Sequence, residues 1–575
     1  MSSALSKRHF PSLFPHIKNY FFVFSILLII LCTNLQNIND AFHQRYYVYE
    51  QDAYMHLVIA SDLLQHKIWY QHVNPRLNIP WGADTHSWTN ATTALLAGGA
   101  ILLNFFMPLD SALYWWGFWL PLIFQALAVG GMLWVVNALK SSTSQQFFVL
   151  GAFLFNPFLN TFFIPLRVDY DFLLITLGIV YWGYLLRFLQ RNKTNFALYT
   201  ALIASLGIWT SISFILPLLI GLAFIFWQVL KQKISPQAVI TLLSSLCINI
   251  IIILFLEHRH FFTVAHDIIS VVHLTFFLLL TLSFIIYTFL PMQKIIIKLI
   301  FFIIAMMVIF AIMNVLFPGF YKGPYNHVDP YLLKNFFPIL SEFYSPFSID
   351  RSLALAIICY FIIGAGYCYY LYLSHTLCPD KLLLLWAATI LTLLTAYMYR
   401  WVEFSMPLTI FLVSFLIKES KSSYPGIKSL LIILLISLPT LILFLAKDYF
   451  LNSQQICQQQ FYLMLRNGFL NQPQFNQDKS IFVHSNYGPL LVYATRYSIV
   501  ATNDHHNPEG LKDSMNFFRE KESDAKQMIL QRKIDLILLC PIEHPTQFNP
   551  HKSSWLKPIP LPSTYSQWQL YRRRN

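Results

Sequence analysis

The sequence predicts an α-helical polytopic membrane protein of about thirteen transmembrane helices, with a small C-terminal α/β domain. Of its 575 residues, 56% are hydrophobic and only 11% are charged. Soluble domains carry about 25% charged residues, so lipid is the expected solvent for most of this chain. Thirteen apolar stretches approach the length of about 20 residues that a spanning helix needs.

The stretches expected to span the membrane lie at 19–35, 113–138, 147–164, 172–190, 195–212, 213–230, 238–256, 266–290, 295–317, 352–374, 381–398, 403–417 and 427–446. The first follows a basic cluster at 7–18 and lacks a small-residue cleavage site. We expect it to be an uncleaved signal anchor with a cytoplasmic N-terminus. A fourteenth apolar stretch, at 91–106, is shorter and is expected to be interfacial or re-entrant.

The basic loops favour this count. If 91–106 does not cross, the basic loops between the predicted spans share the side of the N-terminal basic cluster, as the positive-inside rule requires. They lie at Lys140, 187–193, 231–233, 294–298, Lys381 and 418–421. The net charge of +13 therefore reflects topology, since no basic stripe interleaved with aromatic residues points to nucleic acid.

The number of membrane crossings also decides on which side of the membrane each loop and domain lies. We expect a transmembrane domain over 1–446, with external loops at 36–112 and 318–351, and a soluble α/β domain over 447–575 outside the cytoplasm. In the soluble part, strands are predicted at 480–485, 498–502 and 534–540, and a charged helix at 513–532. Cys457 and Cys540 both lie there, so a disulfide between them is open as an alternative to two free thiols.

The acidic residues that remain near the membrane gather on the external side: Asp52, Asp169, Asp171 and Glu342, with Arg400 at the outer end of the eleventh span. Asp169 and Asp171 share a face only if the backbone between them is extended. Two adjacent carboxylates repel each other, so a cation between them is favoured. Oxygen ligands alone suit a hard divalent ion, Mg²⁺ or Mn²⁺.

Each of these residues also has an ordinary structural explanation. Asp52 could pair with Arg45, and Asp171 could cap the fourth predicted helix. Glu342 could be a plain loop carboxylate, and Arg400 could reach the interface with its charged end.

Together the residues suit the transfer of a group from a lipid-linked phosphate. A divalent ion neutralises the charge that develops on a departing phosphate or pyrophosphate. An arginine adds a bidentate clamp on the same oxygens, and a free carboxylate acts on the acceptor as base or orienting partner. A lipid-linked donor would carry its phosphate at this depth of the membrane.

In this set of residues the chain resembles the catalytic subunit of the oligosaccharyltransferases, within the GT-C membrane glycosyltransferase superfamily. The resemblance is clearest from Asp52 to Arg191, where a loop acid, two spans and an acid-x-acid motif occur in the family's order. It implies metal binding by Asp52, Asp169 and Asp171. It also implies that Glu342 contacts the metal and the acceptor, and that Arg400, before Ser405-Met406-Pro407, contacts the lipid pyrophosphate.

The resemblance is looser in the tail. The family's acceptor-binding WWDYG motif falls on 484–488, where Tyr487 and Gly488 are kept and Asn486 replaces the aspartate. Both tryptophans and the aspartate are missing, which argues against recognition of an Asn-x-Ser/Thr acceptor but not against glycosyl transfer. The chain is therefore most similar to a bacterial branch that lacks an intact motif, with Asn486, Tyr487 and Gly488 as candidate acceptor-binding residues.

Three other segments contain side chains that could bind a metal, an acceptor or a phosphate. The cluster at 257–260, with His266, Asp267 and His273, lacks a known zinc spacing and is interpreted as an anchor at the outer interface. The segment 502–507 could bind acceptor or metal, but its composition favours a turn. The loop 318–351 has no evident element of its own, and its Lys322, His327, Asp329 and Lys334 could meet a lipid phosphate.

The first hypothesis is a metal-dependent inverting glycosyltransferase of a bacterial inner membrane, acting on the outer face. It would move a sugar or glycan from a polyprenyl-(pyro)phosphate donor to a protein, lipid or polysaccharide acceptor. Asp52 and Glu342 are the candidate catalytic residues, Asp52, Asp169, Asp171 and Glu342 the candidate metal ligands, and Arg400 the donor phosphate ligand. The alternatives are a polytopic transporter or lipid flippase, which places its acids near the midplane, and a catalytically degenerate GT-C scaffold.

Overall fold

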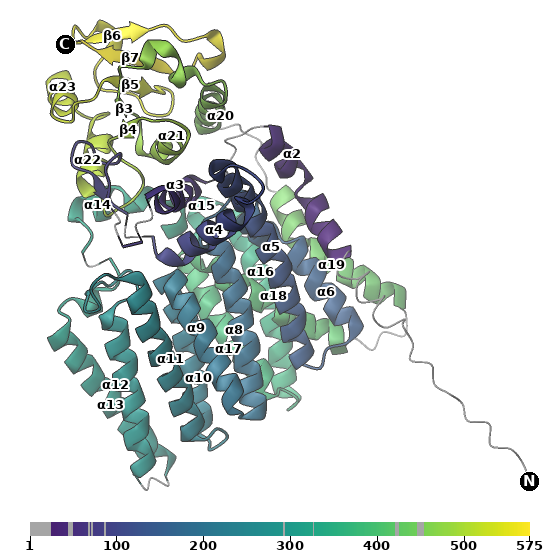
Figure 1. The fold of residues 1–575 in the computed structure, drawn as a ribbon. Helices are drawn as coiled ribbons and strands as arrows, with labels where there is room; N and C mark the ends of the chain where they lie inside the picture. Colours follow the sequence, from purple (N-terminus) through teal and green to yellow (C-terminus); the bar gives the residue numbers. More distant parts are fainter. Residues whose placement is uncertain are drawn as a thin grey trace, which may run out of the picture.

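A computed structural model describes residues 25–43, 50–66, 69–70, 73–85, 88–290, 294–325, 327–419, 425–445 and 453–574. Nine helices within these ranges are long and apolar enough to cross a membrane. They are α5 (Leu109–Ala138), α8 (Asp171–Arg191), α10 (Ile215–Leu230, with the preceding turn), α11 (Pro236–Glu257), α12 (Val271–Phe289), α13 (Ile295–Leu316), α16 (Arg351–Leu373), α17 (Pro379–Tyr397) and α18 (Val402–Glu419, with the preceding turn). Figure 1 shows them as one bundle beneath the C-terminal part of the chain.

The bent pair α6 (Thr143–Leu154) and α7 (Pro157–Asn160), the latter continued by a 3-10 turn, gives a tenth candidate with a bend of 50°. Two further predicted spans are helical but short: α9 (Thr194–Thr210) has 17 residues, and the apolar part of α19 (Pro425–Leu445) covers Ser429–Leu443. The first predicted span runs into residues outside the described ranges. The structure therefore confirms a polytopic helical membrane protein without fixing the count at thirteen.

The segment that was predicted not to cross forms α4 (Asn90–Leu103), a helix of 14 residues. At 1.5 Å per residue it is about 21 Å long, short of a hydrocarbon core of about 30 Å. Beyond its end, Phe105 and Phe106 are 80% and 84% exposed, as expected for side chains at a lipid interface. These features agree with an interfacial segment.

The basic loops at the far end of the bundle also converge as predicted. Lys140, Arg187, Arg191, Lys233 and Lys381 line one cavity there, between the ends of neighbouring helices. These residues come from four of the predicted basic loops, so those four loops lie at one end of the bundle. The predicted basic loop at 418–421 lies largely outside the described side chains.

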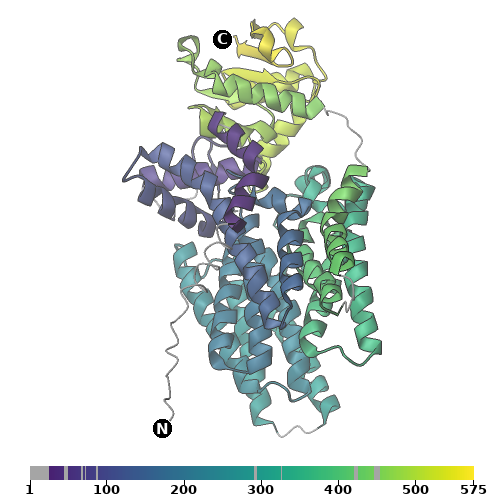
Figure 2. The ribbon, with the colours of Figure 1, turned by 90° about the vertical axis from the view of Figure 1, so that its right-hand side faces the viewer.

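The first loop lies at the opposite end, beneath the C-terminal part. Its elements are α2 (Leu35–His43), α3 (Gln51–His66), the antiparallel pair β1 (Val73–Asn74) and β2 (Ala83–Asp84), and α4. In Figure 1 α3 lies between the bundle and the C-terminal sheet, and Figure 2 shows the purple and dark-blue segments of the first loop at the same end of the bundle. Ala53, Tyr54 and Leu57 of α3 are fully buried, so this helix is packed from both sides.

The loop between α13 and α16 contains short helices, where the sequence predicted no element of its own. The two α-helical turns are α14 (Pro330–Asn335) and α15 (Pro346–Ile349). Each begins at a proline after a capping residue: Asp329 Oδ1 accepts from Tyr331 N at 2.8 Å, and Ser345 caps α15. A capping residue followed by proline is a helix-start signal, so these turns could have been predicted.

The C-terminal part holds a five-stranded sheet in the order β4-β3-β5-β7-β6. The strands are β3 (Ser480–Phe482), β4 (Ser498–Ile499), β5 (Leu536–Leu539), β6 (Leu556–Ile559) and β7 (Gln569–Arg573). β3 pairs in parallel with β4 and β5, and β7 runs antiparallel to β5 and β6. The predicted strands correspond to β3, β4 and β5, whereas β6 and β7 were not predicted.

Four helices accompany this sheet: α20 (Ser453–Arg466), α21 (Gly488–Ala494), α22 (Pro508–Asn516) and α23 (Glu522–Gln531). The single helix predicted at 513–532 is therefore two helices, α22 and α23, with a break that buries Phe517 and Phe518 in the domain core. α20 was not predicted.

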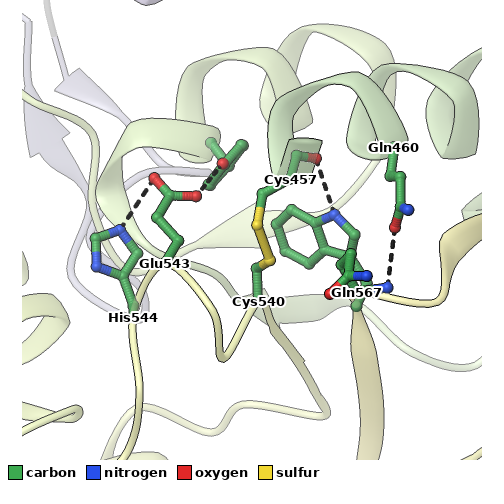
Figure 3. Close-up of a disulfide and its surroundings, with 8 residues drawn as sticks. Cys457, Gln460, Cys540, Glu543, His544 and Gln567 are labelled. Carbon is green, nitrogen blue, oxygen red and sulfur yellow. Dashed lines mark hydrogen bonds and ion pairs between the residues drawn. A yellow bond between two sulfur atoms is a disulfide. The ribbon is translucent and has the colours of Figure 1, made fainter. Parts of the chain in front are cut away.

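A disulfide joins Cys457 of α20 to Cys540 at the end of β5 (Figure 3). The sequence left this pairing open. Two neighbouring hydrogen bonds also attach α20 to the sheet. Trp568 Nε1 donates to Cys457 O at 2.9 Å, and Gln567 N donates to Gln460 Oε1 at 3.0 Å. α20, which leads out of the membrane helices, is thereby fixed to the sheet covalently and by hydrogen bonds.

The first loop also docks on the C-terminal domain. Arg532 is 1% exposed, and its Nη1 donates to Asn78 Oδ1 and Ile79 O, both at 2.9 Å. The backbone of β4 exchanges bonds with the same stretch: Ile499 N donates to Arg76 O at 2.8 Å, and Ile79 N donates to Ile499 O at 3.2 Å. The membrane-side loop thus extends the edge of the sheet, which fixes the domain over the end of the bundle.

Candidate functional site

A cavity of about 550 Å³ lies where the first loop, the ends of the membrane helices, the loop 318–351 and the C-terminal domain meet. It brings together most of the site residues predicted from the sequence, and five further charged ones. Its predicted residues are Asp52, Asp169, Asp171, Glu342, Arg400 and Asn486, and the additional charged ones are Glu50, Arg167, Asp267, Glu403 and Asp504.

Three carboxylates form the centre of the site. Glu50, Asp52 and Asp169 each offer an oxygen within 4.8 Å of the other two. Asp52 lies in the first turn of α3, and Asp169 lies in a bend just before α8. Asp169 is 6% exposed, and its Oδ1 lies 3.6 Å from His56 Nε2. Glu50 was not predicted, although it stands two residues before Asp52.

Arg167 contacts two acidic side chains, Glu50 of the central group and Asp171 outside it. Its Nη2 lies 2.6 Å from Glu50 Oε2 and 3.1 Å from Asp171 Oδ2, and its Nη1 donates to Thr161 O at 2.8 Å. Asp171 is the first residue of α8, and its carboxylate is engaged by Arg167. Among the described residues, it is therefore Glu50 and not Asp171 that completes the group with Asp52 and Asp169.

Arg400 is held by residues from two other segments. Its Nη2 donates to Tyr170 Oη at 2.8 Å, and its Nη1 donates to Tyr325 Oη at 3.4 Å. Glu342 Oε1 lies 3.7 Å from Nη1, and the Glu342 side chain is 45% exposed. Glu342 thus pairs with Arg400, apart from the three central carboxylates. The loop 318–351 reaches the site through Tyr325 and Glu342.

The electrostatics of the centre favour a bound cation. Burial raises the pKa of Asp52 well above its ordinary value, and the charges of Asp169 and Glu50 raise it further. Burial likewise raises the pKa of Glu50 to about 7, against the lowering effect of Arg167. Asp169 differs, because its contacts with His56 and Arg167 outweigh burial and lower its pKa. Carboxylates that raise one another's pKa in this way are stabilised in their charged form by a cation.

The donor set itself fits such an ion. Three carboxylates whose oxygens lie within 4.8 Å of one another supply only hard oxygen ligands, which suit Mg²⁺ and Mn²⁺. The residues present are therefore able to hold a divalent ion at Glu50, Asp52 and Asp169.

The three candidate acceptor-binding residues, Asn486, Tyr487 and Gly488, lie in different surroundings. Asn486 lines the cavity, and its backbone N donates to His484 Nδ1 at 3.3 Å. Tyr487 is 4% exposed, packs on Phe461 and Trp568, and its hydroxyl bonds to Glu543. Tyr487 therefore lies in the domain core.

Position 488 requires glycine for a steric reason. A Cβ atom there would lie 2.2 Å from Ala501 O, so only glycine fits beside that carbonyl. Of the three candidate acceptor-binding residues, only Asn486 reaches the cavity, since Gly488 and Tyr487 do not line it.

Several site residues escaped prediction. Glu50, Arg167 and Glu403 all stand within three residues of predicted ones, so proximity to the acidic motifs was the available signal. Tyr325 carried no signal, because it lies in a loop without periodicity. The proposed pairing of Asp52 with Arg45 falls on a residue outside the described ranges.

Comparison with solved structures identifies the fold. The chain matches the oligosaccharyltransferase AglB of Archaeoglobus fulgidus, in complex with an inhibitory peptide and a dolichol-phosphate, with a TM-score of 0.68. The match covers 92% of this chain and 70% of AglB at 13% sequence identity. The chain therefore has the fold of this oligosaccharyltransferase, in agreement with the resemblance inferred from its motifs.

Two further structures of the Archaeoglobus fulgidus enzyme match as well. One, tethered by a disulfide to an acceptor peptide containing an NVT sequon, has a TM-score of 0.64 at 12% identity, over 90% of this chain and 69% of that one. The other, in complex with Zn and sulfate, has a TM-score of 0.57 at 13% identity, over 90% and 67%. No family model and no curated protein matches the sequence.

Proposed function

We propose that this protein is a metal-dependent inverting glycosyltransferase that takes a sugar or glycan from a polyprenyl-(pyro)phosphate donor. The observation that carries the proposal is the cavity in which Glu50, Asp52 and Asp169 converge and Arg400 lines the wall. It lies in a fold shared with enzymes of this class. A structurally similar enzyme bound to a dolichol-phosphate supports a lipid-linked phosphate as the donor's leaving group.

In this proposal Arg400 binds the leaving phosphate, because its guanidinium is held in one orientation by two tyrosine hydroxyls. The central carboxylates hold a divalent ion, Mg²⁺ or Mn²⁺, which supplies electrostatic stabilisation of the departing phosphate oxygens. Asp171 positions Arg167 and thereby Glu50. A neighbour crystallised with Zn and sulfate supports a divalent ion and an oxyanion in a site of this fold.

The reaction is a single displacement at the anomeric carbon. The acceptor's nucleophilic atom forms a bond to that carbon, and the bond from the carbon to the phosphate oxygen breaks, with its electron pair remaining on the phosphate. Asp52 or Glu342 takes the proton of the acceptor. Attack from the face opposite the phosphate inverts the configuration.

We propose that the acceptor enters between Asn486 and the loop 318–351. The acceptor is a protein, lipid or polysaccharide, and the missing tryptophans and aspartate of the motif argue against a sequon. The disulfide between Cys457 and Cys540 supports an oxidising compartment for the C-terminal domain, and hence the outer face of a bacterial inner membrane with the N-terminus in the cytoplasm.

The test uses the full-length chain in detergent and a radiolabelled fraction of polyprenyl-linked saccharides. A crude membrane extract supplies the acceptor, and label should move from the polyprenyl-linked fraction to protein, polysaccharide or another lipid, separated by chromatography, in the presence of Mn²⁺. Asp52→Asn with Asp169→Asn should abolish this movement, whereas Glu509→Gln, an exposed carboxylate of α22, should leave it unchanged. Equal transfer by the Asp52/Asp169 variant, or transfer that survives metal chelation, would refute the proposal.

A further inference from the structure

A second group of metal-ligating side chains lies at the wall of the same cavity. Asp267, His505 and His506 each offer a ligand atom within 4.8 Å of the other two. Asp267 comes from the loop 258–270 between α11 and α12, and the histidines come from the segment between β4 and α22. The group therefore joins a loop of the membrane helices to the C-terminal domain.

The two imidazoles have the orientation of metal ligands. Both Nε2 atoms face one oxygen of Asp267: His506 Nε2 lies 2.9 Å and His505 Nε2 lies 3.7 Å from Oδ2. The Nδ1 atoms face a second carboxylate, because Asp504 Oδ1 lies 3.4 Å from His506 Nδ1 and 4.0 Å from His505 Nδ1. A histidine that directs one nitrogen to an ion and the other to a carboxylate is the usual arrangement around protein-bound metals.

One ligand atom of the group lacks a hydrogen bond. His505 Nε2 is buried and makes no hydrogen bond to any residue within the described ranges. Its ring is fixed by edge contacts with Tyr325 and Phe337, at centroid distances of 6.0 and 5.7 Å. A buried ring nitrogen that makes no hydrogen bond, and whose carboxylate neighbour Asp267 Oδ2 stays 3.7 Å away, requires an explanation, and a bound ion provides one.

Both segments that present the ligands are held firmly. On the membrane side, Ser270 Oγ donates to Ala265 O at 2.6 Å, and His258 Nε2 bonds to Ile269 O at 2.6 Å, on either side of Asp267. On the domain side, Asn507 Oδ1 accepts from Gly510 N at 3.1 Å and begins α22 directly after the histidines. Ligands fixed by their own surroundings lose little freedom when an ion binds.

We propose that Asp267, His505 and His506 bind a transition-metal ion of the Zn²⁺ class, with Asp504 as the outer partner of both imidazoles. Two imidazole nitrogens and one carboxylate are typical ligands of such ions, whereas the carboxylates of the central group suit Mg²⁺ or Mn²⁺. Three protein ligands leave a coordination position for water. The bound ion cross-links the C-terminal domain to the loop between α11 and α12. The site is independent of the proposed glycosyl transfer.

The experiment measures zinc binding by the full-length chain in detergent. Protein is equilibrated with Zn²⁺ in the presence of excess Mg²⁺, which competes at the carboxylates, and is then desalted and analysed for zinc. We expect about one ion per chain in the wild type and its loss in His505→Gln with His506→Gln. His551→Gln, an exposed histidine of the same domain, and Asp52→Asn with Asp169→Asn should both retain the ion.

A second measurement needs no variant. Zinc-edge X-ray absorption of the wild type should show two imidazole ligands and the remaining ligands as oxygen. An absorption spectrum without imidazole, no zinc in the wild type, or equal zinc in the His505/His506 variant would overturn the proposal and leave an ion-pair network of Asp267 with the two histidines. Because the Asp52/Asp169 variant tests the central carboxylates separately, failure of this site is distinguishable from failure of the proposed catalysis.

Discussion

Arg400 Nη2 donates a 2.8 Å hydrogen bond to Tyr170 Oη, and this bond joins two separate predicted motifs. Tyr170 stands between Asp169 and Asp171, and Arg400 stands just before α18. The tyrosine fixes one nitrogen of the guanidinium, while the other reaches towards Tyr325 and Glu342. The acid-x-acid motif thus positions the arginine through its middle residue.

We predict that Arg400→Lys lowers the rate of sugar transfer by about 100-fold, because an ammonium cannot form the planar two-point contact with phosphate. Tyr170→Phe should lower it by about tenfold, since the guanidinium keeps its charge but loses one positioning bond. Initial rates with the labelled lipid-linked fraction measure both. A Lys variant as active as the wild type would show that Arg400 does not bind the leaving group.

The second prediction distinguishes Asp169, which lies in the central group of carboxylates, from Asp171, which the sequence also predicted as a metal ligand. In a background of His505→Gln and His506→Gln, Asp169→Asn should weaken Mn²⁺ binding by about tenfold or more, whereas Asp171→Asn should weaken it by less than about threefold. The reason is that Asp171 is engaged by Arg167 at 3.1 Å, outside the carboxylate group. Electron paramagnetic resonance titration of Mn²⁺ reports the affinity. Equal losses in the two variants would make Asp171 a ligand.

Much of this site followed from the sequence because polar residues are conspicuous in apolar surroundings. Asp52, Asp169, Asp171 and Arg400 stand at the ends of hydrophobic stretches, and the alternation of basic loops assigned them to one end of the bundle. That end is where the structure brings them together.

Contacts between distant segments could not be predicted in the same way. The group of Asp267 with His505 and His506 joins residues more than 200 positions apart, and neither segment carries a known ligand spacing. The same holds for Arg532, which reaches the backbone of the first loop at Ile79. β6 and β7 were missed because short strands carry little periodicity, and β6 contains Pro558.

The third prediction concerns pH. Burial and the neighbouring His544 hold the pKa of His484 well below its ordinary value of about 6.5. Its Nδ1 accepts a hydrogen bond from Asn486 N, which requires the neutral ring. The unfolded chain takes up a proton near pH 6.5 and the folded one does so at lower pH. The neutral His484 ring therefore contributes its full stabilisation of the folded chain above pH 6.5, and this contribution is lost as the pH falls below 6.5.

Hydrogen exchange over 484–494, corrected for intrinsic rates, should consequently increase between pH 7.5 and pH 5.5. In His484→Gln, whose amide oxygen can accept the same bond without titrating, we expect the difference to shrink. His551→Gln serves as the control, because it removes an exposed histidine of the same domain. An equal pH effect in the His484 variant would assign the change to other groups.

The fourth prediction concerns the disulfide between Cys457 and Cys540, which closes a loop of 83 positions. In the chain-entropy account a crosslink over a loop of this size stabilises the folded state by about 4 kcal/mol, because it restricts the unfolded chain. Reduction should therefore lower the melting temperature of the C-terminal domain, and Cys457→Ala with Cys540→Ala should melt at the reduced value whether or not reductant is present. Cys378→Ala, which removes an exposed free thiol, should behave as the wild type. A wild-type melting temperature unchanged by reductant would mean that α20 is held to the sheet by its hydrogen bonds and packing alone.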